Sequence, residues 1–463
     1  MKIKYPTVGP ILGETTSNHI RLLIRGELEW TDGVPRWCHG VIQIKKSTNK
    51  QYGEPQYFKL NPNFDMTGIA IVEGLESDTS YDYAVGWVFS EVDSSDIDVK
   101  KVLDWSNAAT GKFCTGSNDR NQSRSVIAGS CRYMLKLLGN KWFDDRGDKT
   151  FRSIKEIVDH DKTPINQLIM VGDQIYADDL NIIGADKNLD DYLKRYREVF
   201  TQPNIRDLMK QIPTYMTLDD HEITDNWPAK ASPKDFVTKF PAAMHAYQTY
   251  QLSHSPCIPI KSGKLDGTPT KLWYSYSDGC LDVFAMDTRT ERQLDNNSRK
   301  MISKEQITAL KAWLNDGSGA VKLILTSVPV VGSDSLDKWA GFPAQRFEIL
   351  NFIMTKAIPK VVFLSGDVHA SWSCELSADY IDAPKIISIV SSAFFWPYPV
   401  ALTQSFQQSG KVSIADGKYI SLSNASKICR SDNFTRIDFS STQIVVSIYE
   451  RKGKRFAQKI HEF

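Results

Sequence analysis

Hydrophobic and polar residues alternate with a period of two along much of the first 116 residues. The alternation runs longest through Tyr81, Tyr83, Val85, Trp87 and Phe89. Such a pattern is typical of strands that bury one face, and polar turn signals such as Glu76-Ser77-Asp78 separate the segments. We therefore predict an antiparallel β-sandwich of the immunoglobulin or fibronectin kind over residues 1–116.

The pattern changes after a polar linker that runs from Thr115 to Ser123. Short apolar strands at 125–128 and 168–171 flank a segment whose apolar residues recur at helical spacing. A strand, a helix and a second strand in this order predict a parallel sheet. Alternation returns between residues 434 and 449 and predicts additional edge strands. We assign residues 117–463 to this second, α/β domain.

Several local signals define further elements of the second domain. Apolar stripes at helical spacing lie within 192–200 and 236–247, and Ser303 with Gln306 has the spacing of a capping box. The dipeptide Asp278-Gly279 between two apolar segments predicts a hairpin over 274–284. Aromatic residues at helical spacing most often belong to a core, so these stripes carry no functional assignment.

Four apolar strands of this domain end in side chains suited to metal binding or acid–base chemistry. These ends carry Cys131, Asp173, Asp220 with His221, and Asp367 with His369. Each has an ordinary structural interpretation alone, since Asp173 after Gly172 could simply cap a turn. A parallel sheet, however, brings the carboxyl ends of its strands to one edge, where ligands bind in open α/β sheets. We therefore expect the four ends to form one cluster.

Such a cluster can hold two or more cations. Carboxylate and amide oxygens suit calcium, magnesium or manganese, whereas the Cys131 thiolate and the Tyr176 phenolate suit iron. Asp173 is the most natural bridge between two ions. A pair of ions lowers the pKa of a shared water and clamps the oxygens of an in-line displacement, so a metal-bound hydroxide is the expected nucleophile. His221 could protonate the leaving oxygen or stabilise the equatorial oxygens.

Composition narrows the range of partners and compartments. The 56 Lys and Arg residues against 55 Asp and Glu give a net charge of +1, which provides no general field for nucleic acid or an anionic membrane. No apolar signal segment or long uncharged apolar run occurs, so we expect no transmembrane anchor. The chain as given reads as cytoplasmic, and as secreted or periplasmic if an export signal has been removed. Seven scattered cysteines without a CxxC pair argue against a disulfide framework.

Five motifs occur in order along the second domain: Gly129-Ser130-Cys131, Gly172-Asp173-Gln174-Ile175-Tyr176, Asp219-Asp220-His221-Glu222 with Asn226, Asp287-Thr288-Arg289, and Ser365-Gly366-Asp367-Val368-His369. Together they resemble the motifs of the PhoD-like, or alkaline phosphatase D, branch of the calcineurin-like metallophosphoesterases. The resemblance implies a four-layer α/β-β/α metallophosphoesterase sandwich preceded by an all-β sandwich domain. It also implies hydrolysis of phosphate esters, with phosphodiesters preferred over monoesters.

The resemblance further implies a site with iron plus calcium, for which manganese, magnesium or zinc are alternatives. The implied metal ligands are Cys131, Asp173, Tyr176, Asp220, Asn226, Asp367 and His369. His221 and Arg289 become the catalytic pair, His221 as acid or transition-state stabiliser and Arg289 as a phosphate clamp. The expected partner is a small-molecule phosphate ester, such as a lipid or nucleotide ester, without a stable nucleic-acid complex. The oligomeric state is left open.

The aromatic segment 392–399, which contains Trp396, is a candidate wall of the substrate pocket that would favour an ester with an apolar or stacking group. Its simpler interpretation is a packed loop.

Two other function classes stay open. One is a metal-stapled binding protein without turnover, against which His221 and Arg289 weigh. The other is a binding module that recruits a polymer or partner through the sandwich, although Tyr83 and Trp87 lie in phase with Val85 and should face its core.

Overall fold

The computed structural model describes residues 1–31, 34–35, 37–90, 102–134, 136–137, 142–143, 145–178, 184–295, 298–333, 335–398, 405–415 and 417–463. The aromatic segment 392–399 is therefore described as far as Tyr398, and Pro399 lies outside the described residues.

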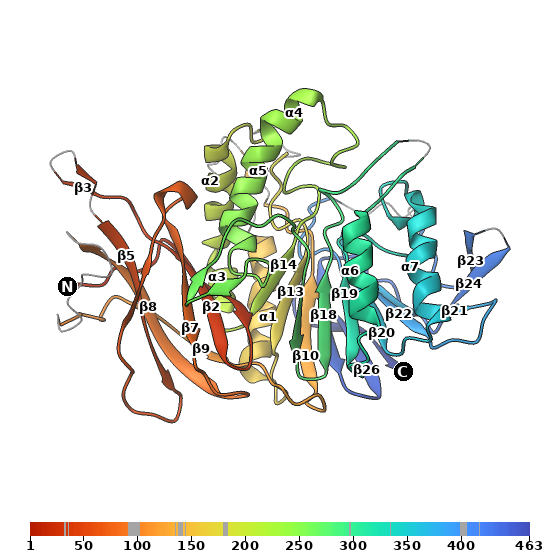
Figure 1. The fold of residues 1–463 in the computed structure, drawn as a ribbon, viewed down its shortest axis with the longest axis horizontal. Coiled ribbons are helices and arrows are strands. Elements are labelled where there is room, and N and C mark those ends of the chain that lie inside the picture. Colours follow the sequence, from red (N-terminus) through yellow and green to blue (C-terminus); the bar gives the residue numbers. More distant parts are fainter. Residues whose placement is uncertain are drawn as a thin grey trace.

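The N-terminal part folds into two antiparallel sheets, as the alternation predicted (Figure 1). One sheet has the order β1-β2-β7 and the other β6-β5-β8-β9. The strands are β1 (Val8–Thr15), β2 (His19–Arg25), β5 (Trp37–Lys46), β6 (Gln56–Lys59), β7 (Thr67–Glu73), β8 (Ser80–Ser90) and β9 (Ala109–Cys114), with the short helix η1 (Pro62–Phe64). The sandwich buries Tyr83 and Trp87 together with Val85 between its sheets, which confirms that the two aromatic residues belong to its core.

Two larger sheets build the second part. The first has the order β14-β13-β10-β25-β26-β27, in which β10, β13 and β14 are parallel. Its strands are β10 (Arg124–Gly129), β13 (Gln167–Val171), β14 (Thr214–Thr217), β25 (Asn433–Phe439), β26 (Gln443–Glu450) and β27 (Arg455–Glu462). The C-terminal alternation was expected to add edge strands. That expectation is wrong for residues 434–449, because β25 pairs with β10 and β26, and β26 pairs on its other side with β27, which forms the edge.

The second large sheet has the order β17-β18-β19-β20-β22-β21-β24-β23. Its strands are β17 (Tyr274–Asp278), β18 (Leu281–Ala285), β19 (Val321–Leu325), β20 (Val361–Ser365), β21 (Trp372–Ala378), β22 (Ile386–Val390), β23 (Gly410–Ala415) and β24 (Lys418–Ser423). β18, β19, β20 and β22 run parallel, whereas β17 and β18 form the hairpin predicted from Asp278-Gly279.

The two large sheets pack face to face and carry helices on their outer faces, which gives four layers (Figure 1). Alternate strand residues such as Val126, Ile169 and Leu323 fill the space between the sheets. Their neighbours Ile127 and Leu168 face the helices on the other side. Burial on both faces explains why these strands read as continuous apolar runs.

The helices of the first outer layer are α1 (Arg146–His160), α2 (Leu189–Phe200), α3 (Pro203–Met209), α4 (Pro233–Val237), α5 (Lys239–Tyr247) and the π-helix η3 (Gln248–Leu252). The second layer contains α6 (Lys304–Leu314), η4 (Trp339–Gly341) and α7 (Pro343–Thr355). Ser303 caps α6 by accepting a hydrogen bond from Gln306 N at 3.1 Å. The single helical stripe expected over 236–247 is wrong, because the structure has two helices there, α4 and α5. In one continuous helix the ring of Pro241 would clash with the backbone carbonyl of Val237, four residues earlier.

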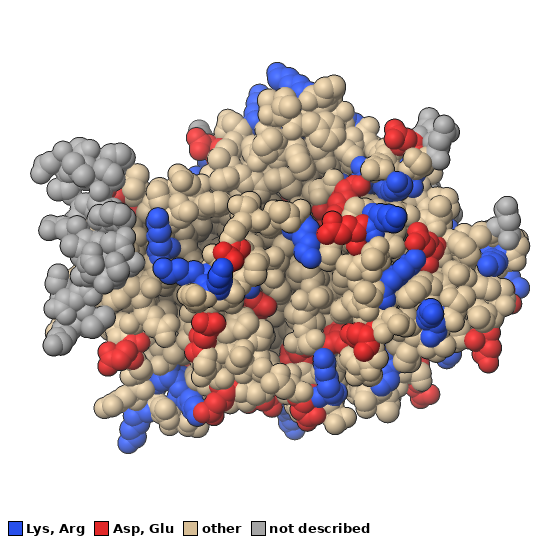
Figure 2. Space-filling view, in the orientation of Figure 1, with Lys and Arg blue, Asp and Glu red and all other residues tan. Residues whose placement is uncertain are grey.

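Short strand pairs complete the described fold: β3 (Trp30–Thr31) with β4 (Val34–Pro35), β11 (Lys136–Leu137) with β12 (Trp142–Phe143), and β15 (Ile260–Lys261) with β16 (Lys264–Leu265). Across the part of the chain that the structure describes, no helix combines the length and apolarity needed to cross a membrane. Figure 2 shows basic and acidic side chains interspersed over one face, in line with the balanced composition.

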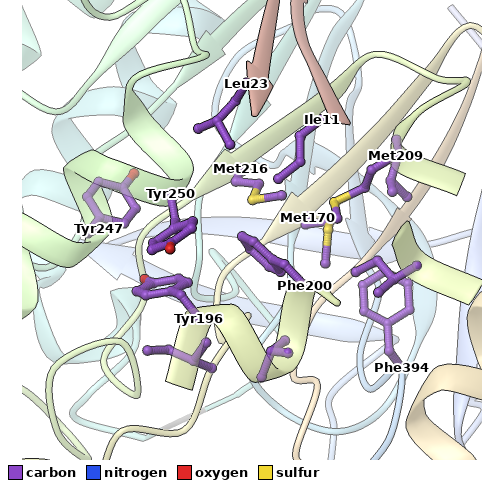
Figure 3. Packing of buried hydrophobic residues seen from close by; sticks show 14 of the residues in the cluster. Ile11, Leu23, Met170, Tyr196, Phe200, Met209, Met216, Tyr247, Tyr250 and Phe394 are labelled. Carbon is purple, nitrogen blue, oxygen red and sulfur yellow. The ribbon is translucent and has the colours of Figure 1, made fainter. Parts of the chain in front are cut away.

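The N-terminal sandwich shares a core with the α/β part. Ile11 and Leu23 of the sandwich lie in one hydrophobic cluster with Met170 and Met216 of the six-stranded sheet (Figure 3). Tyr83 also donates a hydrogen bond across the boundary to the carbonyl oxygen of Lys210, at 2.6 Å. The two parts are therefore joined by apolar packing as well as by the linker.

Candidate metal centre

The carboxyl ends of strands from both large sheets supply the site. Cys131, Asp173 and Asp220 follow β10, β13 and β14 of the six-stranded sheet, whereas Asp367 follows β20 of the eight-stranded sheet. The expectation that one sheet edge carries all four ends is therefore wrong. Because β18, β19 and β20 pair with one another, they form a second sheet that faces the first. The cluster lies where the edges of the two sheets meet.

The backbone is in the left-handed region at five of the predicted ligands. Their φ values are 57° at Cys131, 58° at Asp173, 57° at Asn226, 71° at Asp367 and 54° at His369. Residues other than glycine adopt this conformation rarely and at an energetic cost. Such strain collects where function fixes the direction of side chains, so its concentration here singles out these strand ends.

Cys131, Asp173 and Tyr176 form one compact buried group. The Cys131 thiol and the Tyr176 hydroxyl both donate to Asp173 Oδ2, at 3.3 and 3.4 Å. Burial raises the pKa of the Cys131 thiol and of the Tyr176 phenol well above their usual values, and the carboxylate of Asp173 adds to both effects. A cation at this position would reverse that preference, because coordination favours the deprotonated thiol and phenol.

His221 is held between an aromatic ring and a carboxylate. Its ring stacks on Tyr176 with 4.2 Å between centroids, and its Nδ1 lies 2.9 Å from both oxygens of Asp178. Burial would lower the pKa of His221, but the carboxylates of Asp220 and Asp173 raise it well above its usual value. Without a bound cation these carboxylates favour the imidazolium form, and Nε2 is the nitrogen that does not contact Asp178.

Glu222 fixes the two loops that carry the central carboxylates. It accepts hydrogen bonds from the backbone N–H of Asp173 at 3.1 Å, of Gln174 at 2.6 Å and of Asp219 at 2.9 Å. Burial raises the pKa of Glu222 to about 7. Sequence reasoning quoted Glu222 within its motif but gave it no role, because backbone acceptors leave no signal in a linear pattern.

Arg289 lies at the centre of a group of carboxylates and is fully buried. Its guanidinium contacts Asp219 through Nε, Asp337 through Nη1 at 2.9 Å and Asp220 through Nη2 at 3.4 Å. Asp367 is more distant, at 3.8 Å. Arg289 is thus within the site, as predicted, and neutralises its carboxylates. Its role as a phosphate clamp stays a prediction.

Lys338 and Asp337 were missed by the sequence analysis. The Lys338 ammonium contacts the carboxylate of Asp367 and lies 3.1 Å from Asp337 Oδ2. Arg292 also pairs with Asp337, at 2.6 Å. These residues belong to loops without a strand or helix signal, and only the fold brings them next to the strand ends.

Asn226 and His369 lie at the rim of the cluster. The backbone N–H of Asn226 donates to Asp220 Oδ2 at 2.5 Å, while its side-chain amide donates to Asp225 at 2.8 Å. The ring of His369 stacks on Trp396, with 3.9 Å between centroids. Burial lowers the pKa of His369 to about 3, so its imidazole is neutral and able to act as a ligand.

The donor set fits a metal centre with more than one ion. Ligand atoms of Asp173, Asp220 and His221 lie within 4.8 Å of one another, and so do those of Asp219, Asp220 and Asp367. Asp220 is common to both groups, so it is a second candidate for the bridge assigned to Asp173. Among the described residues, the buried Asp219 Oδ2 has no hydrogen-bond partner, as expected of an oxygen that awaits a cation. Within the part of the chain that the structure describes, neither group includes the predicted ligands Cys131 and His369.

Comparisons with known proteins identify a family and two related folds. A model of the PhoD-like phosphatase family matches residues 137–447. Alkaline phosphatase D of Bacillus subtilis (strain 168) is 29% identical over 226 residues, which cover 42% of this chain and 37% of the relative. The match thus spans little more than a third of that curated protein.

Two solved structures share the fold. A structure of PhoD has a TM-score of 0.69 at 18% identity, over 99% of this chain and 92% of that chain. Purple acid phosphatase PPD1 from yellow lupin (Lupinus luteus) seeds has a TM-score of 0.60 at 12% identity, over 97% and 73% of the two chains. The four-layer metallophosphoesterase sandwich with its N-terminal all-β region is therefore the fold of this protein.

Proposed function

Because the chain belongs to the PhoD-like phosphatase family, we propose that it is a metal-dependent hydrolase of phosphate esters that prefers phosphodiesters to monoesters. The observation that carries the proposal is that two sets of candidate metal ligands share Asp220 where the two large sheets meet. The left-handed backbone at Asp173 and Asp367 supports a functional rather than a purely structural role.

Two or more metal ions would be held by the buried donors on either side of Asp220. Cys131, Asp173 and Tyr176 would form the softer side, suited to iron, and Asp220 and Asp367 the harder side, suited to calcium. Asn226 and His369 would complete the ligands at the rim. When bound, such ions supply an activated water and stabilise charge on the phosphoryl oxygens. Manganese, magnesium or zinc are alternative ions for the centre.

His221 would act as the proton donor in the reaction. Asp178 accepts from its Nδ1, which fixes the ring and directs Nε2 away from Asp178. In the imidazolium form, Nε2 carries a proton that it can donate to the leaving oxygen of the ester or to an equatorial oxygen. A dyad of this kind is of no use to a metal site that only staples the fold.

The preference for diesters rests on the aromatic surface beside the site, since the charge that a substrate meets there is set largely by the bound ions. The ring of Trp396 beside His369 would accept an apolar or stacking substituent, such as that of a lipid or nucleotide ester.

The proposal is tested by hydrolysis of bis-p-nitrophenyl phosphate and of the corresponding monoester. Metal-replete protein should cleave the diester with the higher kcat/KM, a chelator should abolish turnover, and added iron and calcium should restore it. Absence of turnover in protein shown to contain its metals would favour the alternative of a metal-stapled binding protein. Faster cleavage of the monoester would overturn the diesterase preference alone.

A further inference from the structure

A cavity lies between the N-terminal sandwich and the α/β part, separate from the metal centre. Its volume is about 520 Å³. Residues of β6 and β7 line one side, and residues of η3 and of the β15–β16 hairpin line the other. It contains none of the candidate metal ligands, so it is a site of its own rather than an extension of the candidate centre.

The lining predicts the chemistry of a ligand. The apolar surface comes from Ile42, Tyr57, Phe58, Phe64, Ile69, Ile71, Ile258 and Leu265. The charged side chains in the described lining are Lys59 and Lys264, both exposed, and no carboxylate accompanies them there. A body of aromatic or aliphatic carbon with one anionic group satisfies both features, because the lysines attract the anion while the walls bury the body.

The π-helix η3 connects this cavity to the metal centre. Gln248 and Thr249 line the cavity, while two residues further along Gln251 donates to Glu222 Oε1 at 3.2 Å. Gln251 also donates to the Tyr196 hydroxyl at 2.9 Å, and the rings of Tyr196 and Tyr250 stack beside it (Figure 3). Short π-helical turns of this kind are frequently found at functional sites.

Glu222 completes the connection. Its Oε2 accepts from the backbone N–H groups of Asp173 and Asp219, the residues that open the two carboxylate loops. Its Oε1, to which Gln251 donates, also accepts from the backbone N–H of Gln174 in the first of these loops. A shift of Gln251 therefore changes the support of these loops without any contact between a ligand and the metal centre. Tyr250, between Thr249 and Gln251, contacts Asp65 of the sandwich, so η3 links both sides of the cavity.

We propose that this cavity binds a small amphipathic anion and that its occupancy adjusts phosphoesterase activity through η3, Gln251 and Glu222. The binding claim stands independently of the proposed function, whereas the effect on activity rests on it. The coupling requires the ligand to bind one arrangement of η3 more tightly than another.

Binding is tested with anilinonaphthalenesulfonate, an aromatic anion, added to metal-replete full-length protein. We expect saturable fluorescence at one site, unchanged by inorganic phosphate, which would compete only at the metal centre. Ile71→Trp should fill the cavity and abolish this binding. The pair Lys59→Gln and Lys264→Gln should weaken it about tenfold, since each lysine supplies a charge-assisted contact. Matched controls are Val102→Trp and Lys112→Gln, whose side chains are exposed on the sandwich.

Two outcomes overturn the proposal at different points. If both cavity variants fold by circular dichroism and bind the probe as wild type does, the cavity is not the site. Because the lysine variants alter only exposed side chains, they keep this test valid even if Ile71→Trp fails to fold. If the probe binds in the cavity but leaves kcat/KM for the diester unchanged, the coupling through η3 is wrong. Failure of the proposed function is distinct, because wild type would then lack turnover with or without the probe.

Discussion

The Nδ1 atom of His221 lies 2.9 Å from both carboxylate oxygens of Asp178, which orients the imidazole toward the central carboxylates. Asp178→Asn should therefore lower kcat for the diester about 10- to 100-fold, because the ring loses the partner that fixes its tautomer and direction. Steady-state kinetics and metal analysis of the same preparation provide the check. An exposed control, Asp266→Asn, should behave as wild type. Full activity of Asp178→Asn would remove His221 from the role of acid.

Arg289 should contribute to stability as well as to catalysis, because it is buried among Asp219, Asp220 and Asp337. Arg289→Met leaves these carboxylates without their cation and should lower the free energy of unfolding of chelator-treated protein by about 3–5 kcal/mol. Urea denaturation measures this change. Unchanged stability with lost activity would instead identify Arg289 as a phosphate clamp alone.

Trp396 should determine selectivity rather than turnover as such. Its ring lies 3.9 Å from that of His369, and Tyr398 beyond it is 43% exposed. Trp396→Ala should reduce kcat/KM for a thymidine p-nitrophenyl diester about 5- to 100-fold relative to that for a methyl p-nitrophenyl diester. This is the effect expected from the loss of one base–aromatic stacking contact. Trp396→Phe is the control that keeps an aromatic ring. An equal loss for both esters would mean that Trp396 only packs the loop.

His254 should make the protein less stable in mild acid. Burial, with a smaller effect of Arg21, lowers the pKa of His254 to about 4. In the unfolded chain the imidazole of His254 takes up a proton near pH 6.5. The contribution of neutral His254 to the free energy of unfolding is therefore fully present above pH 6.5 and is lost as the pH falls toward 4. From pH 7.5 to 5.5 the contribution is about 1 kcal/mol. Urea unfolding of His254→Gln should lack this part of the pH dependence, and an identical dependence in both proteins would contradict the assignment.

Much of the fold follows from periodicity. The alternation through Tyr83 and Trp87, the hairpin at Asp278-Gly279 and the cap at Ser303 are all present. These signals are local, and each depends on burial or turn chemistry within a few residues. The division of the strands between two sheets is not local, because buried strands of either sheet carry the same apolar run. For that reason the single sheet edge expected from the sequence is wrong.

The site shows the same division. Asp173, Asp220 and Asp367 could be identified because each lies two or three residues beyond the end of a buried strand. Lys338 and Asp178 could not, since their roles depend on which side chains the fold brings within reach. Glu222 acts through backbone N–H groups, which the sequence does not display.

The central claim is that Asp173 and its neighbours form a metal centre that hydrolyses phosphodiesters. The most direct measurement determines turnover of bis-p-nitrophenyl phosphate and metal content in Asp173→Asn, beside Asp190→Asn, an exposed substitution of the same kind on α2. The account predicts that Asp173→Asn folds, loses at least one metal ion per chain and loses nearly all turnover, while Asp190→Asn matches wild type. Retention of both metal and activity in Asp173→Asn would contradict it.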